Sequence, residues 1–198
     1  MKIFYSPTSP YSAKVRMAAI YLDFDVTAVE VATSPAPAEL LAANPLGKIP
    51  TLLTDDGDAV FDSRAIMHYL HRLSGEKLYP SKDEKRTRAE VLEALCDGIT
   101  DSLLSIVYER RMRPENMVHQ PWIDRQWEKV SRGLDHLESH LPKTGKSLHG
   151  GHFALAALTG YLALRFGGQW EAEHPKLAAW PTEFAGQFKS YAKIKPQA

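Results

Sequence analysis

The pattern of the sequence changes near residue 80, and this change constrains the fold more than any other feature. Before it, short runs of β-forming residues alternate with runs of helical periodicity, and after it only helical patterns occur. Alternating strands and helices are typical of a small sheet covered by helices. We therefore expect an α/β half followed by an all-α half, joined across the stretch from Gly75 to Ser81.

The first half is expected to contain seven elements in the order β-α-β-α-β-β-α. Its last two strands flank Asp55-Asp56-Gly57-Asp58, which is typical of a hairpin turn. The expected strands are residues 2–5, 27–31, 51–54 and 59–61, and the expected helices are residues 11–22, 37–43 and 63–73.

The second half contains apolar residues at helical spacing, which predict two long helices and two shorter ones. The apolar face of the first long helix is expected to be Val91, Leu95, Ile99, Leu103 and Val107, and that of the second Ile123, Trp127, Val130, Leu134, Leu137 and Leu141. The shorter helices are expected at residues 153–166 and 177–188.

Composition excludes several classes of function. The 198 residues include 24 Lys and Arg and 24 Asp and Glu, so the formal net charge is zero and no nucleic-acid partner is expected. The longest apolar stretch, residues 153–166, is too short to span a bilayer, and the N-terminal residues lack the apolar core of a signal peptide. The single cysteine, Cys96, fits a reducing compartment. We expect a cytoplasmic globular protein with no membrane partner.

Two features suggest chemistry but have simpler interpretations. His136 and His140 lie four residues apart on a predicted helix, but no third ligand is evident, so we favour a solvated helix face and expect no metal. Thr144-Gly145-Lys146-Ser147 ends like a phosphate-binding loop but lacks the leading glycine, so we interpret it as a surface loop.

Three segments of the first half carry the functional signal. Ser9-Pro10 is typical of a helix start capped by serine, and places a hydroxyl where a helix N-terminus can receive an anion. Ile49-Pro50 opens a strand, and a cis bond there would turn the backbone of Ile49 outward, to pair with an extended peptide. Asp62-Ser63 stands where a strand passes into a helix, so the helix N–H groups can hold a carboxylate and Asp62 an ammonium.

These three segments, in this order and followed by an all-helical half, resemble the cytosolic glutathione transferase family. The likeness extends over essentially the whole chain, including Tyr161-Leu162-Ala163-Leu164-Arg165 and Pro175-Lys176-Leu177-Ala178-Ala179-Trp180. It implies a thioredoxin-like domain over residues 1–78, a linker over residues 79–84 and a helical bundle domain over residues 85–198. It also implies a homodimer.

The resemblance further implies roles for individual residues. Ser9 matches the catalytic residue, which is serine in tau-class and cysteine in omega-class enzymes. Ile49 precedes the position of the family's cis-proline, here Pro50, and its backbone is expected to pair with the cysteinyl unit of glutathione. Asp62-Ser63 matches the pair that holds the γ-glutamyl group, and Lys48 is near enough to attract the glycyl carboxylate. The expected lining of the second-substrate pocket, between the domains, is Tyr11, Tyr108 and Arg111.

Two positions depart from the family pattern. The family usually has Glu or Gln in place of Asp62, one methylene longer, so contact with the amine can need a water. The helical domain normally carries a Ser/Thr-x-x-Asp capping box where this chain has His149 and His152, and Gly150-Gly151 weakens the first turn further. We expect a marginal helix start there, either stabilised by other contacts or frayed.

The expected activity is conjugation of the glutathione thiolate to small hydrophobic electrophiles, with glutathione as a substrate. Ser9 cannot form the mixed disulfide that a disulfide reductase requires. Two alternatives remain open. One is a glutathione transferase-like binding or regulatory module without significant turnover, and the other is a glutathione-dependent peroxidase or isomerase.

Overall fold

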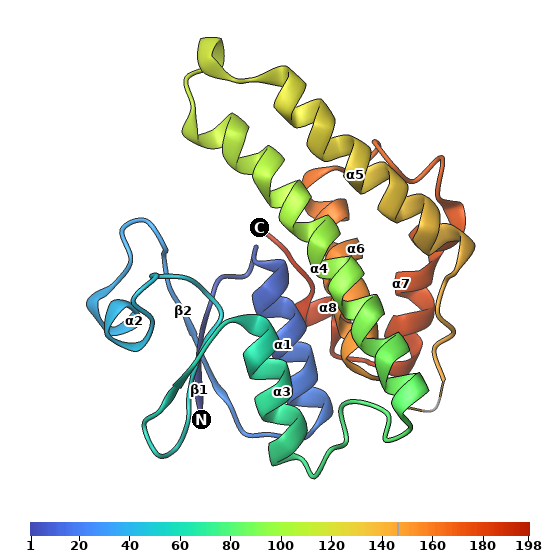
Figure 1. Ribbon diagram of the computed structural model, residues 1–198. Coiled ribbons are helices and arrows are strands. Elements are labelled where there is room, and N and C mark those ends of the chain that lie inside the picture. The colour runs from blue at the N-terminus through green and yellow to red at the C-terminus, as the bar shows by residue number, and fades with distance from the viewer. Residues whose placement is uncertain (146) are drawn as a thin grey trace.

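The computed structural model describes residues 1–145 and 147–198 and contains an α/β half and an all-helical half (Figure 1). Each segment expected in the first half coincides with an observed element to within one residue at either end. These elements are β1 (Lys2–Tyr5), α1 (Pro10–Tyr21), β2 (Thr27–Glu30), α2 (Ala38–Ala43), β3 (Thr51–Leu53), β4 (Ala59–Val60) and α3 (Ser63–Leu73).

The four strands form one sheet in the order β2-β1-β3-β4. Strand β1 is parallel to β2 and antiparallel to β3, and β3 is antiparallel to β4, which is a thioredoxin-like arrangement. Phe4 lies opposite Thr51, and Leu52 lies opposite Val60. The chain therefore leaves β1, enters β3 and leaves β4 at the same end of the sheet, and the three segments singled out from the sequence meet there. Helices α1 and α3 lie side by side between the sheet and the helical half (Figure 1).

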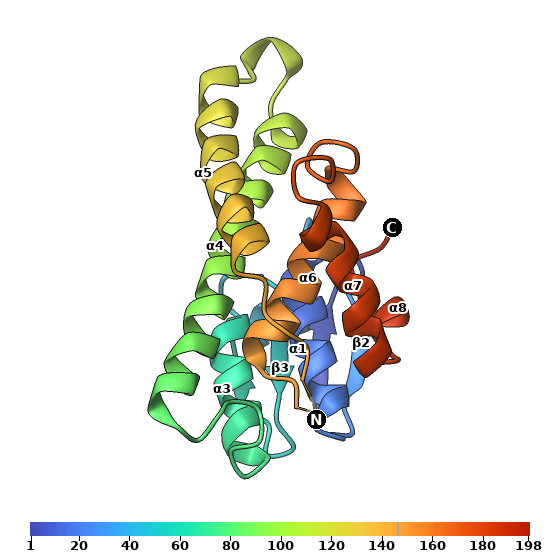
Figure 2. The ribbon, with the colours of Figure 1, turned by 90° about the vertical axis from the view of Figure 1, so that its right-hand side faces the viewer.

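The second half is built around α6, which is buried from residue 150 to residue 162. This helix packs against both α4 and α1, and Figure 2 shows it between α4 and α7. Among the described residues, no helix is long and apolar enough to cross a membrane. The elements are α4 (Asp83–Met112), the 3-10 helix η1 (Glu115–Met117), α5 (Gln120–Ser139), α6 (Gly150–Arg165), α7 (Pro175–Gln187) and α8 (Tyr191–Ile194).

The apolar face expected for the first long helix, α4, is only partly correct. Ile99 and Leu103 are buried, whereas Val91 is 60% exposed. Since a turn holds about 3.6 residues, residues four apart drift by about 40° at each step, and a run of five cannot stay on one face. The buried side of α4 includes two acidic residues instead, Glu93 and Asp97. Their partners, described below, explain why acids occupy these positions.

The second long helix, α5, follows its expected face more closely, because Ile123, Val130, Leu134 and Leu137 are buried. The last residue of that predicted face, Leu141, lies beyond the end of the helix at Ser139. The short elements η1 and α8 were not expected from periodicity, because a single turn holds too few residues to show it. Lys146, in the loop expected at the surface, lies outside the described residues.

Helix α6 begins at Gly150, and its first turn is buried. The N–H of His149 donates to Nδ1 of His152 at 3.2 Å, which is one half of a capping box built from imidazoles. The N–H of Gly150 donates to the carbonyl of Leu78 at 3.2 Å. A Cβ on Gly150 would lie 2.5 Å from the ring of Tyr79, so glycine is needed for this close approach. The helix start is therefore stabilised by other contacts, the first of the two expected alternatives.

The two histidines of this cap favour the neutral state in the folded protein. Burial lowers the pKa of His149 to about 4, with a smaller contribution from electrostatic repulsion by His152. Burial also lowers the pKa of His152. Because the folded-state pKa lies below the usual value of about 6.5, the stabilisation is fully present above that pH. It is lost as the pH falls from about 6.5 toward 4.

We predict that acid destabilises the protein through this pair. Because the pKa of His149 is about 4 in the folded protein and about 6.5 in the unfolded chain, lowering the pH from 7.5 to 5.0 should reduce the free energy of unfolding by about 2 kcal/mol. The double substitution His149→Ser, His152→Gln supplies a capping box with no titrating group, and should remove this loss. Urea unfolding at the two pH values measures it, with the exposed His140→Gln as control. An equal pH dependence in the double variant and the wild type would contradict the assignment.

Candidate functional site

Ser9 lies at the start of α1, as the sequence predicted. It is the N-cap, and its Oγ accepts a hydrogen bond from the N–H of Ser12 at 3.2 Å. Pro10 occupies the first helical position. The hydroxyl of Ser9 is half-buried, and its proton is not used by the capping bond, so it can donate to a ligand.

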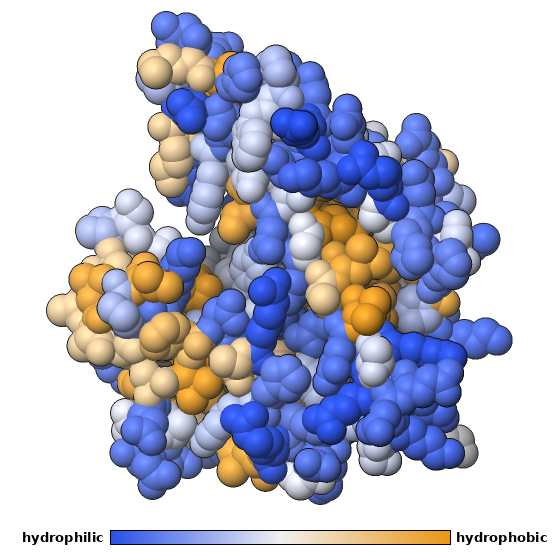
Figure 3. All heavy atoms as spheres, in the orientation of Figure 1, coloured by the Kyte–Doolittle hydropathy of each residue, from blue (hydrophilic) through white to orange (hydrophobic). Residues whose placement is uncertain are grey.

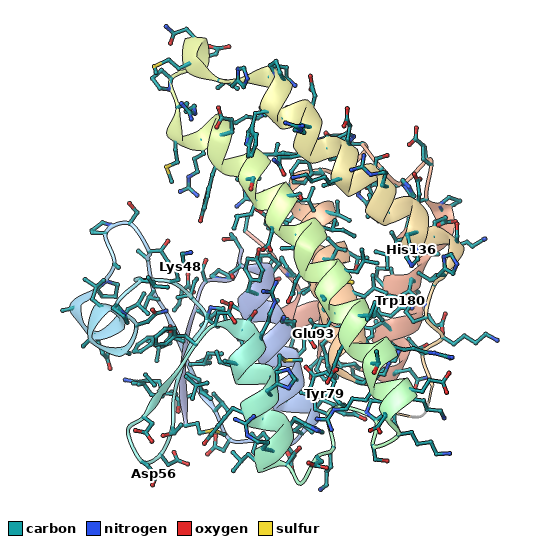
Figure 4. The ribbon with its side chains drawn as sticks, viewed as in Figure 1. Lys48, Asp56, Tyr79, Glu93, His136 and Trp180 are labelled. Atoms are coloured by element: carbon teal, nitrogen blue, oxygen red, sulfur yellow. The ribbon has the colours of Figure 1, made fainter. Side chains whose placement is uncertain are left out.

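The loop before β3 is held in place by Asn44. Its Nδ2 donates to the carbonyl of Lys48 at 3.0 Å and to Oγ1 of Thr51 at 3.1 Å, and its Oδ1 accepts from the N–H of Leu46 at 3.0 Å. The Ile49-Pro50 bond in this loop is cis. Lys48 is exposed, and Figure 4 places it at the edge of the α/β half that faces the upper part of α4. Sequence analysis missed the role of Asn44, although an Asn before Pro is a common signal for such a turn.

Asp62 and Ser63 lie at the start of α3. Asp62 is the N-cap, and its Oδ1 accepts from the N–H of Arg64 at 3.0 Å. The carboxylate is exposed, whereas Ser63 is buried. One oxygen of Asp62 thus serves the helix and the other remains available to a ligand. Together with Ser9 and the loop at Ile49-Pro50, these residues occupy the same end of the sheet.

A buried lysine joins this part of the chain to the helical half. Lys14 of α1 is 1% exposed, and its Nζ contacts Asp97 at 2.8 and 2.9 Å and Glu93 at 3.0 Å. Tyr79 donates to the second oxygen of Glu93 at 2.5 Å, and Figure 4 shows Glu93 pointing from α4 toward α1 and α3. Burying a charge without counter-charges costs several kcal/mol, so this cluster fixes α1 against α4.

Arg64 extends the cluster to the start of α3. Its Nε lies 3.2 Å from Oδ2 of Asp97, and its Nη2 lies 3.8 Å from Oδ2 of Asp101. Burial alone would lower the pKa of Arg64, but the charges of Asp97 and Asp101 raise it above its ordinary value. Tyr11 donates to Oδ1 of Asp101, and burial followed by this bond raises its pKa. The same acids on α4 thus contact both helices whose N-termini carry the predicted site.

Sequence analysis missed Lys14, Arg64 and their acidic partners. Glu93 and Asp97 are four residues apart on α4, a spacing that resembles an ordinary solvated helix face. The signal that could have found them is Lys14, which lies among small and apolar residues on the buried side of α1. Cys96, on the adjacent part of α4, is buried, and burial raises the pKa of its thiol.

The three residues expected at the second-substrate pocket come from α1 and α4. Tyr11 is half-buried in the first turn of α1, Tyr108 is 46% exposed, and Arg111 is exposed. Burial raises the pKa of Tyr161 on α6, and the polar groups near its hydroxyl are Arg165, Tyr108 and Arg111. Tyr161 also lies near Tyr11. Tyr161, which sequence analysis did not assign to the site, thus lies near all three predicted residues.

The grooves between α4 and α5 contain no predicted site residue. One, of about 400 Å³, is lined by residues that include Ser102, Lys129 and His136. The other, of about 320 Å³, is lined by residues that include Arg110 and Trp127. The described part of the chain contains no group of three His, Cys, Asp or Glu that could hold a metal.

Comparison with known proteins agrees with this architecture. Residues 3–78 match the glutathione S-transferase N-terminal domain, and residues 120–180 match the glutathione S-transferase C-terminal domain. The uncharacterized GST-like protein YibF of Escherichia coli (strain K12) is 31% identical, covering 99% of this chain and 98% of that protein. The chain belongs to the glutathione S-transferase family.

Two solved structures are similar over the full length. A glutathione S-transferase from Methylobacillus flagellatus KT with GSH bound is 36% identical, with a TM-score of 0.88 over 99% of both chains. A glutathione transferase family member from Pseudomonas fluorescens Pf-5 with bound S-(propanoic acid)-glutathione is 32% identical, with a TM-score of 0.87 over the whole of both chains.

We predict that the buried cluster makes a large contribution to stability. Lys14→Met keeps the length of the side chain but leaves Glu93 and Asp97 without their buried counter-charge, and should cost about 3–5 kcal/mol in the free energy of unfolding. The exposed Lys85→Met on α4 should change it by less than about 0.5 kcal/mol. Chemical denaturation measures both. Equal effects of the two substitutions would contradict the structural role of Lys14.

Proposed function

We propose that this chain is a glutathione transferase that joins the thiolate of glutathione to small hydrophobic electrophiles. The observation that carries the proposal is the position of the Ser9 hydroxyl, at the end of the sheet where Ile49-Pro50 and Asp62-Ser63 also lie. The relatives crystallised with GSH or a glutathione derivative support it, because they are similar over the full length of the chain.

Each part of glutathione has a matching group in this arrangement. The γ-glutamyl amine is assigned to Asp62, and its carboxylate to Ser63 and the first N–H groups of α3. The cysteinyl unit is assigned to the backbone of Ile49, and the glycyl carboxylate to the exposed Lys48. The sulfur then lies at the start of α1, where Ser9 donates a hydrogen bond that favours the thiolate.

The hydroxyl contributes only part of the rate enhancement. Lowering a thiol pKa of about 8.5 by roughly two units raises the thiolate fraction at pH 7 from about 3% to about 75%. The nucleophilicity of the thiolate falls by roughly eightfold at the same time, because the Brønsted slope of thiolate reactivity against thiol pKa is about 0.4–0.5. The net gain is about threefold. Most of the catalysis must therefore come from holding the sulfur and the electrophile close together, between α1 and the upper half of α4.

The alternatives differ in what the bound thiolate does. A binding or regulatory module would hold glutathione without turnover, and a peroxidase or isomerase would use it on a different substrate. We favour conjugation, because Ser9 supplies a donor to the sulfur and no second thiol. The Pseudomonas fluorescens relative was crystallised with S-(propanoic acid)-glutathione, whose sulfur carries a substituent. This supports the proposal, because the product of conjugation is also a glutathione with a substituted sulfur. We further propose that the protein is a cytoplasmic homodimer.

We predict that Asp62 is required for glutathione binding. Asp62→Asn removes the charge but keeps a good N-cap for α3. It should lower the affinity for glutathione at least about tenfold in calorimetric titration. Asp56→Asn, at the tip of the β3–β4 hairpin and far from Lys48 in Figure 4, is the control and should have no effect. Wild-type protein that does not bind glutathione would contradict the proposed function, and equal affinity in the Asp62 variant would contradict the assigned site.

We predict that Ser9 lowers the pKa of the bound thiol. In Ser9→Ala the thiolate absorbance of bound glutathione should titrate about two pH units higher than in wild type, because the donor to the sulfur is lost. Ser12→Ala is a matched control, because it retains the backbone N–H that donates to Oγ of Ser9 and removes only a buried hydroxyl that has no hydrogen-bond partner in the described structure. An unchanged titration in Ser9→Ala would rule out the role given to its hydroxyl. Turnover with an aromatic halide separates the enzyme from the binding module.

A further inference from the structure

The face of α4 that carries Asp97 continues beyond the α/β half. The next residues on this face are four, seven, eleven and fourteen positions after Asp97, so they share one side of the helix. They are Asp101, Leu104, Tyr108 and Arg111. Figure 3 shows the surface hollowed between this upper part of α4 and the lobe that contains α2. Tyr108 and Arg111 are exposed on this upper part of α4, which borders the hollow.

Helix α6 carries two more polar groups near Tyr108 and Arg111. Tyr161 is 3% exposed, and the side-chain partner of its hydroxyl is Arg165. Arg165, one turn later on α6, is exposed and lies beside this hydroxyl. Since Tyr108 and Arg111 also lie near Tyr161, two phenols and two guanidinium groups from α4 and α6 converge.

The acids near this group already have partners. Asp101 accepts from Tyr11 and lies 3.8 Å from Arg64, and Glu109 pairs with Arg113 at 2.7 Å. Arg111 and Arg165 form no salt bridge with any residue that the structure describes. The group therefore contains two cations that form no salt bridge with a described residue, and two phenol hydroxyls near them.

We propose that the second-substrate pocket binds electrophiles that carry a carboxylate, held by Arg165 and Arg111 together with the hydroxyls of Tyr161 and Tyr108. A guanidinium group matches a carboxylate with two parallel hydrogen bonds, and phenols add donors in the same place. The inference rests on the proposed function, because it concerns the partner of glutathione in the same site. The hydrophobic part of such an electrophile would contact the aromatic rings and Leu104.

The carboxylate is not consumed in the reaction. With an α,β-unsaturated acid, the sulfur forms a bond to the β-carbon, and the π pair of the double bond moves to the α-carbon, which takes a proton from water. That proton balances the one lost by the thiol, so no oxidant or reductant is needed. With a haloaryl acid, the carbon–sulfur bond forms and halide leaves. In both cases the product is a glutathione conjugate that keeps its carboxylate.

Calorimetry with a matched pair of conjugates tests the proposal without requiring turnover. S-(2-carboxyethyl)glutathione and its carboxamide have the same shape and differ in charge. The wild type should bind the acid at least about tenfold more tightly than the amide, when the affinity for each conjugate is divided by the affinity for glutathione of the same protein. Arg165→Gln and Arg111→Gln should each reduce this preference about tenfold. Arg110→Gln, on the same turn of α4 but lining the groove toward α5, should preserve it.

Turnover supplies an independent readout with 4-chloro-3,5-dinitrobenzoate and its methyl ester. The acid should have the lower KM in the wild type, and Arg165→Gln should raise the KM for the acid with little change for the ester. Equal binding of acid and amide, or a preference that survives both arginine substitutions, would overturn the proposal. Those results would leave the proposed function intact if glutathione still binds, whereas no binding of glutathione would contradict the proposed function itself.

Discussion

The buried ammonium of Lys14 is the constraint on which the arrangement of the two halves depends. An ammonium group inside a protein must be matched by counter-charges in good geometry, and the matching carboxylates of Asp97 and Glu93 come from α4. This requirement sets where α1 lies along α4. Because α1 begins at Ser9, it also sets where that hydroxyl lies relative to the helical half. Arg64 brings the start of α3 to the same carboxylate of Asp97, so one cluster positions both helix N-termini of the site.

The choice of a hydroxyl at the start of α1 separates this site from those of thiol–disulfide exchange enzymes. A helix N-terminus favours an anion whether the neighbouring group is an alcohol or a thiol. Only a thiol can form a mixed disulfide, whereas the alcohol of Ser9 can stabilise the thiolate and leave the sulfur free to attack carbon. In the proposed reaction the gain in thiolate is largely offset by lower nucleophilicity, so alignment of the sulfur and the electrophile would have to supply most of the rate. This is why a rigid connection between α1 and α4 matters for the proposed reaction.

The features that could be predicted from the sequence are the local ones. Ser9 and Asp62 are caps recognisable from their neighbours, and the strands and helices of the first half follow from short-range pattern. Lys14 is separated in the chain from Glu93 by 79 positions and from Asp97 by 83, so no local pattern reveals these ion pairs. The exposed position of Val91 has the same origin, because the buried side of α4 is set by where its acids meet Lys14. Tyr161 was read as part of an apolar helix, and only the packing of α6 against α4 brings it to Arg111.

A crystal structure of the complex with glutathione tests the central claim most directly. We expect the cysteinyl sulfur to lie within hydrogen-bond distance of Oγ of Ser9, with the γ-glutamyl group against the first turn of α3 and the backbone of Ile49 paired with the cysteinyl unit. A tripeptide bound with its sulfur remote from the start of α1, or bound in the grooves between α4 and α5, would contradict it.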